Sequence, residues 1–305
     1  MNSRATFRFA VLTLTIAAAL LLPGCIIVTN GSSDSARYTE TRTVRVPVSS
    51  GTPVDVRSRN GGVDISSVAG SEAIITAVIS ARTQERLDET RIVADAGTGR
   101  LDIRVEWPDN RAQSGEGCSF RIDTPSPGNI HVETSNGRVS VRDASGHAEI
   151  DTSNASIRVV NFNGDVNATT SNGRIELRDI AGAADANTSN GSIDLINIGG
   201  RAFATTSNAS ATVHLTDSSP GPVQIRTSNG SIDLALGRNF SGDLRLATSN
   251  GRLRFDSPVE VRDFESGRSA TLRFGTGGGS SSAVTSNGSL SVTSHAAAQQ
   301  PVGAP

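Results

Sequence analysis

The sequence predicts an all-β protein, mainly a parallel β-solenoid (a β-helix) of about 18 residues per coil, with a β-rich N-terminal lead-in. Three observations predict this fold class. The tripeptide Thr-Ser-Asn recurs eight times from residue 134 onward. Apolar residues alternate with polar ones on both sides of each copy, which is the period of a strand with one buried face. The chain of 305 residues has 31 Gly and only 4% aromatic residues, a composition that suits thin stacked coils.

Residues 1–24 are predicted to be a signal peptide. Arg4 and Arg8 precede an apolar run over residues 9–22, which is shorter than the roughly 20 residues that span a bilayer. The sequence LPGC at residues 22–25 then resembles a bacterial lipobox. We therefore expect Cys25 to be the lipid attachment site, with palmitate among its acyl chains. The alternative is an ordinary signal peptide with an incidental Cys.

Residues 25–42 are expected to form the lipidated Cys and a flexible tether, because Thr29 to Arg42 is polar and has no periodicity. Ile26, rather than Asp, follows the Cys. By similarity to Gram-negative lipoproteins, this favours the outer membrane. Cys118 would then be the only free thiol. It ends a loop-like stretch with no His nearby in sequence, so we expect an unreactive thiol rather than a nucleophile.

Residues 43–127 form the predicted β-rich N-terminal region. Val54 to Gly70 carries the repeat's template once in weaker form, so it is expected to be a degenerate first coil. Residues 74–80 and 101–107 read as strands, and residues 83–90 as one or two helical turns. Residues 74–107 are expected to be irregular relative to the regular stack, and residues 109–117 to form an exposed loop.

Residues 128–294 are predicted to be the β-solenoid repeats, and residues 295–305 a disordered tail. The Thr of each Thr-Ser-Asn unit lies at 134, 152, 170, 188, 206, 227, 248 and 285. Apolar or small residues stand two and four positions before it and five and seven positions after it, so Thr shares the inward parity. One unit cannot bury its own apolar face, and stacked units can. We expect the coils from Thr134 to Thr248 to stack in sequence order, with the longer spacings absorbed at turns near residues 218–221 and 237–239.

The Asn of each unit is predicted to form a structural ladder. Each side-chain amide would donate to one neighbouring coil and accept from the other, as in stacked β structure. Asn also points inward if the strand phase persists into the bend, and the Gly that follows in six of eight units is expected to take a positive φ. The alternative is that the column binds a ligand. The predicted ladder residues are Asn136, Asn154, Asn172, Asn190, Asn208, Asn229, Asn250 and Asn287.

The outward column six residues after Thr has mixed charge, and Arg158 and Glu176 on adjacent coils are expected to pair. A solvated face is the simpler interpretation, and a binding strip is the alternative. Asp143 and Asp179 share one register two coils apart, about 10 Å. That is near the upper end for an inverting glycosidase pair. Both follow an Arg, so a mixed-charge surface is the simpler reading here too.

Composition excludes several function classes. A net charge of −2, with one Trp and one Tyr, argues against a nucleic-acid partner. The four His show no metal-ligand spacing, and the Gly-Gly-x-Gly-x-Asp calcium repeat is absent. We therefore predict no metal, no cofactor and no catalytic residues.

The lipobox, polar tether, β-rich lead-in and repeated T-S-N-G-x-I-x-L-x-x-I-x-G units resemble the bacterial "putative adhesin" family, a domain of unknown function. The resemblance covers roughly Val44 to Ser294 and is best over residues 170–182 and 188–200. It implies an envelope protein with a β-solenoid domain, and it implies no catalytic residues.

The leading hypothesis is therefore a non-enzymatic cell-envelope lipoprotein whose adhesin-like β-solenoid acts as a surface or binding scaffold. Its expected partners are the membrane, through Cys25, and an envelope protein or a polysaccharide. One alternative is a polysaccharide-active β-helix enzyme, and another is an accessory protein in envelope stress sensing. The oligomeric state is left open, as are the handedness of the solenoid and the number of sides per coil.

Overall fold

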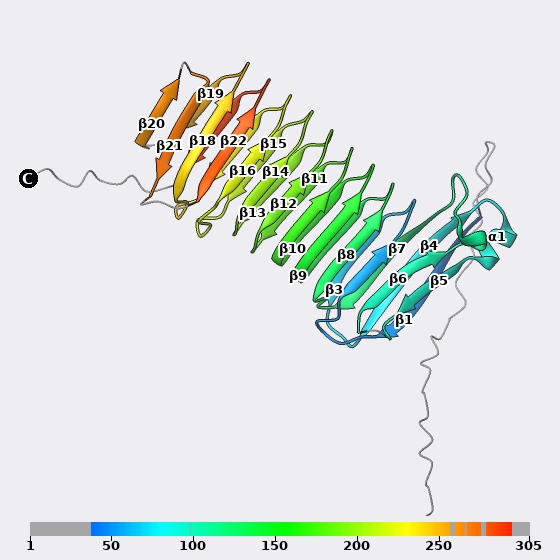
Figure 1. The fold of residues 1–305 in the computed structure, drawn as a ribbon. Helices are drawn as coiled ribbons and strands as arrows, with labels where there is room; N and C mark the ends of the chain where they lie inside the picture. The colour runs from blue at the N-terminus through cyan, green and yellow to red at the C-terminus, as the bar shows by residue number, and fades with distance from the viewer. Residues whose placement is uncertain (1–37, 98, 257–259, 266, 276–278, 295–305) are drawn as a thin grey trace, which may run out of the picture.

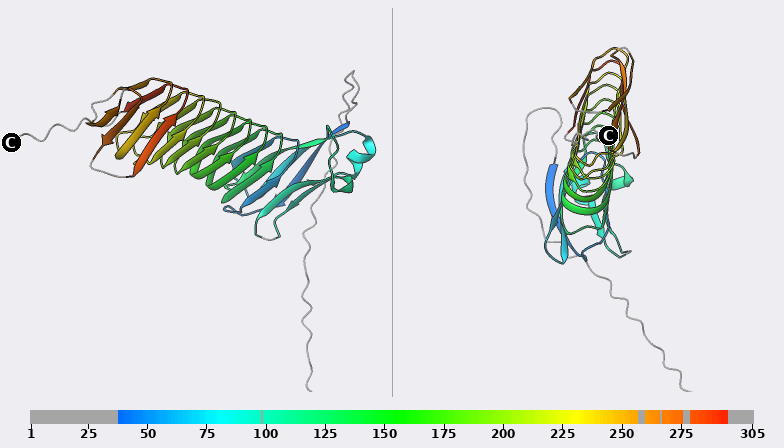
Figure 2. Two further views of the ribbon diagram at one scale, coloured as in Figure 1. Left: turned by 45° about the horizontal axis from the view of Figure 1, so that its top comes forward. Right: turned by 90° about the vertical axis from the view of Figure 1, so that its left-hand side faces the viewer.

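The structure is a computed structural model that describes residues 38–294 except 98, 257–259, 266 and 276–278. The predicted signal peptide, Cys25 and the predicted tail from residue 295 lie outside the described residues. The described chain winds into a long flattened stack of coils (Figures 1 and 2). Each coil has two strands, so the coil has two sheet faces, and the all-β, parallel solenoid prediction is confirmed.

Face A contains the strands that precede the Thr-Ser-Asn bends, together with β2 and β6, which continue the same sheet. In spatial order it runs β6 (Leu101–Glu106), β2 (Val54–Arg57), β8 (Asn129–Thr134), the second half of β9 (Val139–Thr152), the second half of β10 (Ile157–Thr169), β12 (Ala184–Asn187), β14 (Ala202–Thr205), β16 (Val223–Arg226), β22 (Ser280–Thr285) and β18 (Gly242–Thr248).

Face B contains the strands that follow the bends. In the same order it runs β7 (Gly117–Pro125), β3 (Val63–Val68), the first halves of β9 and β10, β11 (Ile175–Ile180), β13 (Ile193–Ile198), β15 (Ala211–Leu215), β17 (Ile232–Leu236), β23 (Leu290–Ser294) and β19 (Leu253–Asp256). Adjacent strands within each face are parallel, and they pair residues that hold equivalent positions in coils adjacent in space.

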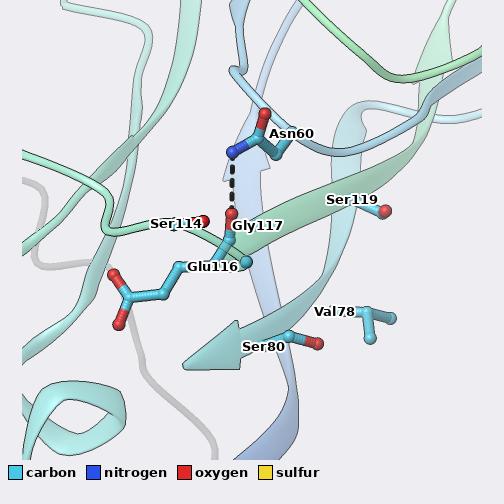
Figure 3. Close-up of a pocket in the computed structure, with 8 residues that line it drawn as sticks. Asn60, Val78, Ser80, Ser114, Glu116, Gly117 and Ser119 are labelled. Carbon is cyan, nitrogen blue, oxygen red and sulfur yellow. Dashed lines mark hydrogen bonds between the residues drawn. The ribbon is translucent and has the colours of Figure 1, made fainter. Parts of the chain in front are cut away.

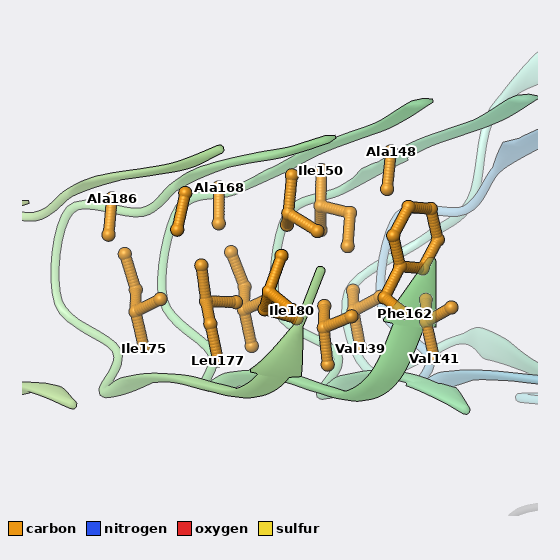
Figure 4. Packing of buried hydrophobic residues seen from close by; sticks show 14 of the residues in the cluster. Val139, Val141, Ala148, Ile150, Phe162, Ala168, Ile175, Leu177, Ile180 and Ala186 are labelled. Atoms are coloured by element: carbon orange, nitrogen blue, oxygen red, sulfur yellow. The ribbon is translucent and has the colours of Figure 1, made fainter. Parts of the chain in front are cut away.

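The core is one layer thick and lies between the two faces. Figure 4 shows Ala148, Ala168 and Ala186 on face A opposite Ile175 and Leu177 on face B. All of them are buried, as the period-two pattern predicts. Small residues on one sheet let the other sheet approach closely, so a core with few bulky residues is still fully packed.

The order of coils in space differs from their order in the chain. The predicted sequential stack is wrong at its last step, because β18 does not pair with β16. The last coil, β22–β23, lies between the β16–β17 coil and the β18–β19 coil. The predicted first coil, β2–β3, is confirmed, because its strands pair in parallel with β8 and β9. A later segment, β6–β7, stacks on the outer side of this coil. The expectation that residues 74–107 are irregular relative to the stack is therefore wrong for β6, since Leu101 pairs with Val54 in parallel.

Antiparallel strands cover the ends of the stack. At the N-terminal end, β4 (Glu72–Ala81) pairs with β7, β1 (Tyr38–Pro47) pairs with β4, and β5 (Arg91–Asp95) pairs with β6. At the other end, β21 (Ser269–Phe274) pairs with β18, and β20 (Glu260–Glu265) pairs with β21. Since β1 begins at Tyr38, the last five residues of the predicted tether are in a strand.

A buried ion pair holds the N-terminal cap together. The helix α1 (Gln84–Glu89) carries Arg86, whose guanidinium donates to both carboxylate oxygens of Glu116, at 2.8 and 2.9 Å. The backbone N–H groups of Gln113 and Arg82 donate to the same carboxylate. Together these bonds lower the pKa of Glu116 to about 2. Glu116 follows the turn η1 (Pro108–Asn110), so the predicted exposed loop is anchored by a fully buried residue.

No helix within the described part of the chain is both long and apolar enough to cross a membrane.

Candidate functional surface

The Asn residues of the bends form one continuous column along an edge of the stack. Each Nδ2 donates to the Oδ1 of the preceding coil at 2.7–2.9 Å. The column begins at Asn60, an additional rung that sequence reasoning placed in the first coil without assigning it to the ladder. In space it runs Asn60, Asn136, Asn154, Asn172, Asn190, Asn208, Asn229, Asn287 and Asn250.

The Asn side chains are exposed, so the expectation that they point inward is wrong. The strand phase ends at the bend, and the alternation therefore does not reach Asn. Thr does point inward, as predicted, and its hydroxyl forms a second column that the sequence analysis missed. Thr188 Oγ1, for example, donates to the carbonyl of Gly173 at 3.2 Å and accepts from Gly191 N at 3.2 Å.

The Gly after Asn is required by contact with the preceding coil, and the expected positive φ is wrong for these residues. A Cβ on Gly191 would lie 1.7 Å from the carbonyl oxygen of Gly173, and one on Gly173 would lie 1.7 Å from that of Ala155. Coils one strand spacing apart leave no room for a side chain there. Positive φ occurs instead at the opposite edge, at Asp143, Asn161, Asp179 and Asn197.

The structural role of the Asn column stays a prediction, which single substitutions test. Asn190→Ala removes two column bonds, to Asn172 and from Asn208, whereas Asn250→Ala removes one. We expect the free energy of unfolding to fall by about 1–3 kcal/mol at Asn190 and by about half that at Asn250. Asn187→Ala, on an exposed strand position, is the matched control and should change it by less than about 0.5 kcal/mol. Equal effects at Asn190 and Asn187 in urea unfolding would contradict a structural column.

Face B carries a network of ion pairs on its outer side. The predicted pair of Arg158 and Glu176 is confirmed at 3.2 Å. Arg178 also donates to Glu176, and Arg174 donates to Asp194 of the next coil at 2.7 Å. Burial acts to raise the pKa of Glu176, but the hydrogen bond from Arg178 and the charges of Arg158 and Arg174 together lower it below its usual value.

Face A of the same coils carries carboxylates. His131 lies 3.3 Å from Glu133 and 3.5 Å from Glu149. The pKa of Asp151 is raised, first by burial and then by the neighbouring Glu149. In the part of the chain that the structure describes, no group of three His, Cys, Asp or Glu residues is arranged to hold a metal ion.

The acidic pair considered for hydrolysis lies on the edge opposite the Asn column. Asn161 donates to Asp143 at 2.7 Å, and Asn197 donates to Asp179 at 2.8 Å. All four side chains are exposed. Each of the two carboxylates therefore accepts a hydrogen bond from an Asn of the next coil. Both carboxylates lie on an exposed edge of the stack, which is unlike the cleft of a hydrolase.

A shallow hollow lies where the Asn column begins. It is lined by Asn60, Val78, Ser80 and the loop that ends in Gly117 (Figure 3). Asn60 Nδ2 donates to the backbone carbonyl of Glu116 at 2.9 Å, which closes the column at this end. Cys118 does not end a loop, as the sequence suggested, but lies in β7. Its side chain is buried, and burial raises the pKa of the thiol to about 12. Burial and the raised pKa disfavour the thiolate, which is the reactive form, in agreement with the unreactive thiol expected from the sequence.

The paired strands and stacked side-chain columns define a parallel β-solenoid with two polar outer faces. No family model matches the chain, and no curated protein matches it. Solved structures that resemble it include a "putative cell adhesion protein" from Clostridium sporogenes (10% identity, 83% of this chain and 99% of that one, TM-score 0.28). A "putative lipid binding protein" from Parabacteroides distasonis (9%, 83% and 96%, TM-score 0.40) and a "putative adhesin" from Bacteroides fragilis (9%, 83% and 96%, TM-score 0.35) are also similar.

Two of these names agree with the family that the repeat resembles. All three TM-scores lie below 0.5, so the fold assignment rests on the strand pairing of this chain alone.

Proposed function

We propose that this chain is a non-enzymatic cell-envelope lipoprotein whose β-solenoid acts as an adhesin-like surface or binding scaffold. The observation that carries the proposal is the pair of flat outer faces, which continue in register over ten stacked coils. Nine steps of about 4.8 Å give each face a length of about 43 Å. Such a surface suits recognition of an extended partner, an envelope protein or a polysaccharide.

The predicted lipid at Cys25 supplies the anchor in this proposal. The described chain starts with β1 at one end of the stack, and the β20–β21 cap lies at the other end (Figure 1). An anchor that precedes β1 would therefore place the N-terminal cap toward the membrane and the far coils away from it. Outer-membrane location and lipidation both belong to the proposal.

Three measurements test this function. We expect Cys25→Ser to move the protein from the membrane fraction to the soluble fraction, with Cys118→Ser as the matched control that stays membrane-bound. We also expect deletion of the gene to reduce surface attachment or envelope integrity, and the full chain to recover a partner in a pull-down from envelope material. The proposal would be contradicted if the pull-down recovered no partner and the deletion changed neither surface attachment nor envelope integrity. Release of sugar products from a polysaccharide, abolished by Asp179→Asn, would show an enzyme instead.

A further inference from the structure

The two outer faces of the same four coils carry opposite charge. Over residues 129–187, the outward strand positions of face A hold five carboxylates and no Arg. Over residues 138–196, face B holds five Arg at outward strand positions or directly before a strand, against Glu176 and Asp194 on the strands and Asp143 and Asp179 at the edge. The negative patch is Glu133, Glu149, Asp151, Asp165 and Asp185. The positive patch is Arg138, Arg142, Arg158, Arg174 and Arg178.

The ion pairs within face B leave its positive charge on the outside. The side chains of Glu176 and Asp194 are only 15% and 18% exposed, whereas their partners Arg158 and Arg174 are 52% and 54% exposed. The carboxylates therefore lie beneath the guanidinium groups. Arg142 pairs with Asp64 of the neighbouring coil, and Arg138 donates to the Ser156 hydroxyl at 3.2 Å.

Three carboxylates of the negative patch, Glu133, Glu149 and Asp165, are exposed, and Asp151 and Asp185 are half-buried. Glu133 and Glu149 are 55% and 52% exposed, His131 lies within 3.5 Å of both, and Arg57 lies 3.8 Å from Glu133. Carboxylates this close repel one another, so a cationic surface laid over them would be favourable.

We infer that the positive patch of one copy docks on the negative patch of a second copy of this chain, so that copies stack side by side through opposite faces. Both patches lie on flat sheets of the same coils and have the same spacing between rungs. Sheets stack face to face at about 10 Å. A copy displaced sideways without rotation therefore sets rows of Arg against rows of carboxylate.

The size and symmetry of this contact follow from the fold. A patch of four coils about 4.8 Å apart is about 19 Å long and about 17 Å wide, so it offers roughly 300 Å² per partner. This is below the usual value of about 800 Å² for a specific interface, so we expect weak association that needs a high protein concentration. The two patches are different surfaces, so the contact is heterologous and leaves a free patch on each side of every pair. Association therefore produces open rows rather than closed dimers, and because it is electrostatic it weakens with salt.

A charge-swap experiment tests the inference on the full chain in a neutral detergent. Analytical ultracentrifugation should show concentration-dependent association that weakens about tenfold or more between low salt and about 0.5 M NaCl. Arg138→Glu/Arg158→Glu leaves three Arg in the positive patch against the two introduced Glu, Glu176 and Asp194, so face B becomes negative. Glu133→Arg/Glu149→Arg/Asp151→Arg leaves two carboxylates against three introduced Arg, so face A becomes positive. Each variant alone should be monomeric, because both of its patches then have the same sign. An equimolar mixture should associate again, because the two reversed patches complement each other.

A charge reversal outside the two patches is the control for this experiment. Arg226→Glu/Arg245→Glu, on face A outside the negative patch, should associate like the unaltered chain. Thermal unfolding should show that all variants are folded, and Arg138→Gln/Arg158→Gln provides a milder change if the reversal is not tolerated. A monomer at all concentrations and low salt, or association that survives both reversals, would overturn the inference. The proposed binding of an envelope partner would be unaffected by either result, because it is measured separately by pull-down.

Discussion

Replacing Arg86 by Leu should lower the free energy of unfolding by about 3–5 kcal/mol, because it leaves the buried carboxylate of Glu116 without its cation. Glu116 is fully buried and ties α1 to the segment that precedes β7. Hydrogen exchange should show the loss first in β7 and α1. Replacing both partners by Leu should recover only part of the stability, since Gln113 and Arg82 would then lose their acceptor.

The pH dependence and a matched variant identify the cause. The pKa of Glu116 falls from 4.5 to about 2 in the folded chain. Its contribution to stability is therefore complete above the ordinary value and is lost as pH falls through about 2. Arg104→Leu removes a surface arginine that pairs with Asp102 and Glu106, and should cost less than about 1 kcal/mol. A similar loss at Arg104 and Arg86 in urea unfolding at neutral pH would contradict this account.

Ending the chain after Gly279 removes β22 and β23, and it should also unfold the neighbouring strands β18 and β19. The deleted coil, β22–β23, lies between two other coils, and the buried Leu290 and Val292 contribute about 3–6 kcal/mol. The strands β18 and β19 lose their parallel partners at the same time. We therefore expect amide exchange protection to disappear over residues 242–256 as well.

The control for this deletion is a chain that ends after Ser294, which should keep the exchange pattern of the full chain. In a stack that followed chain order, removing the last coil would expose one end only. Protection that persists over residues 242–256 would mean that β18–β19 can stack directly on β16–β17, which the repeat spacing also permits.

Much of this fold could be predicted from the sequence because it depends on local periodicity. The inward positions, such as Ile157 and Val159, follow from alternation, and Thr keeps the same parity. The order of the last two coils could not be predicted, since Thr248 and Thr285 sit at equivalent offsets in their units and either coil fits either place. The antiparallel strands at the two ends of the stack could not be predicted either. The pairing of β4 with β7, for example, depends on contacts between segments that are distant in the sequence.

The candidate surface was predicted less completely than the fold. The Arg158–Glu176 pair follows from the register of adjacent coils, and it could be read from the spacing. The opposite charge of the two faces could also have been found by sorting outward residues by the side of the bend on which they lie. The buried Glu116 could not, because nothing local distinguishes it from the acidic residues of exposed loops.

The Asn column also gives the stack an electrical direction. Every side-chain amide donates toward the N-terminal cap, so the dipoles of nine amides add along the axis instead of cancelling. At one end the terminal N–H of Asn60 meets the Glu116 carbonyl, and at the other the column ends in the Oδ1 of Asn250. That end carries partial negative charge, as the C-terminus of a helix does, and favours a cation or an N–H donor.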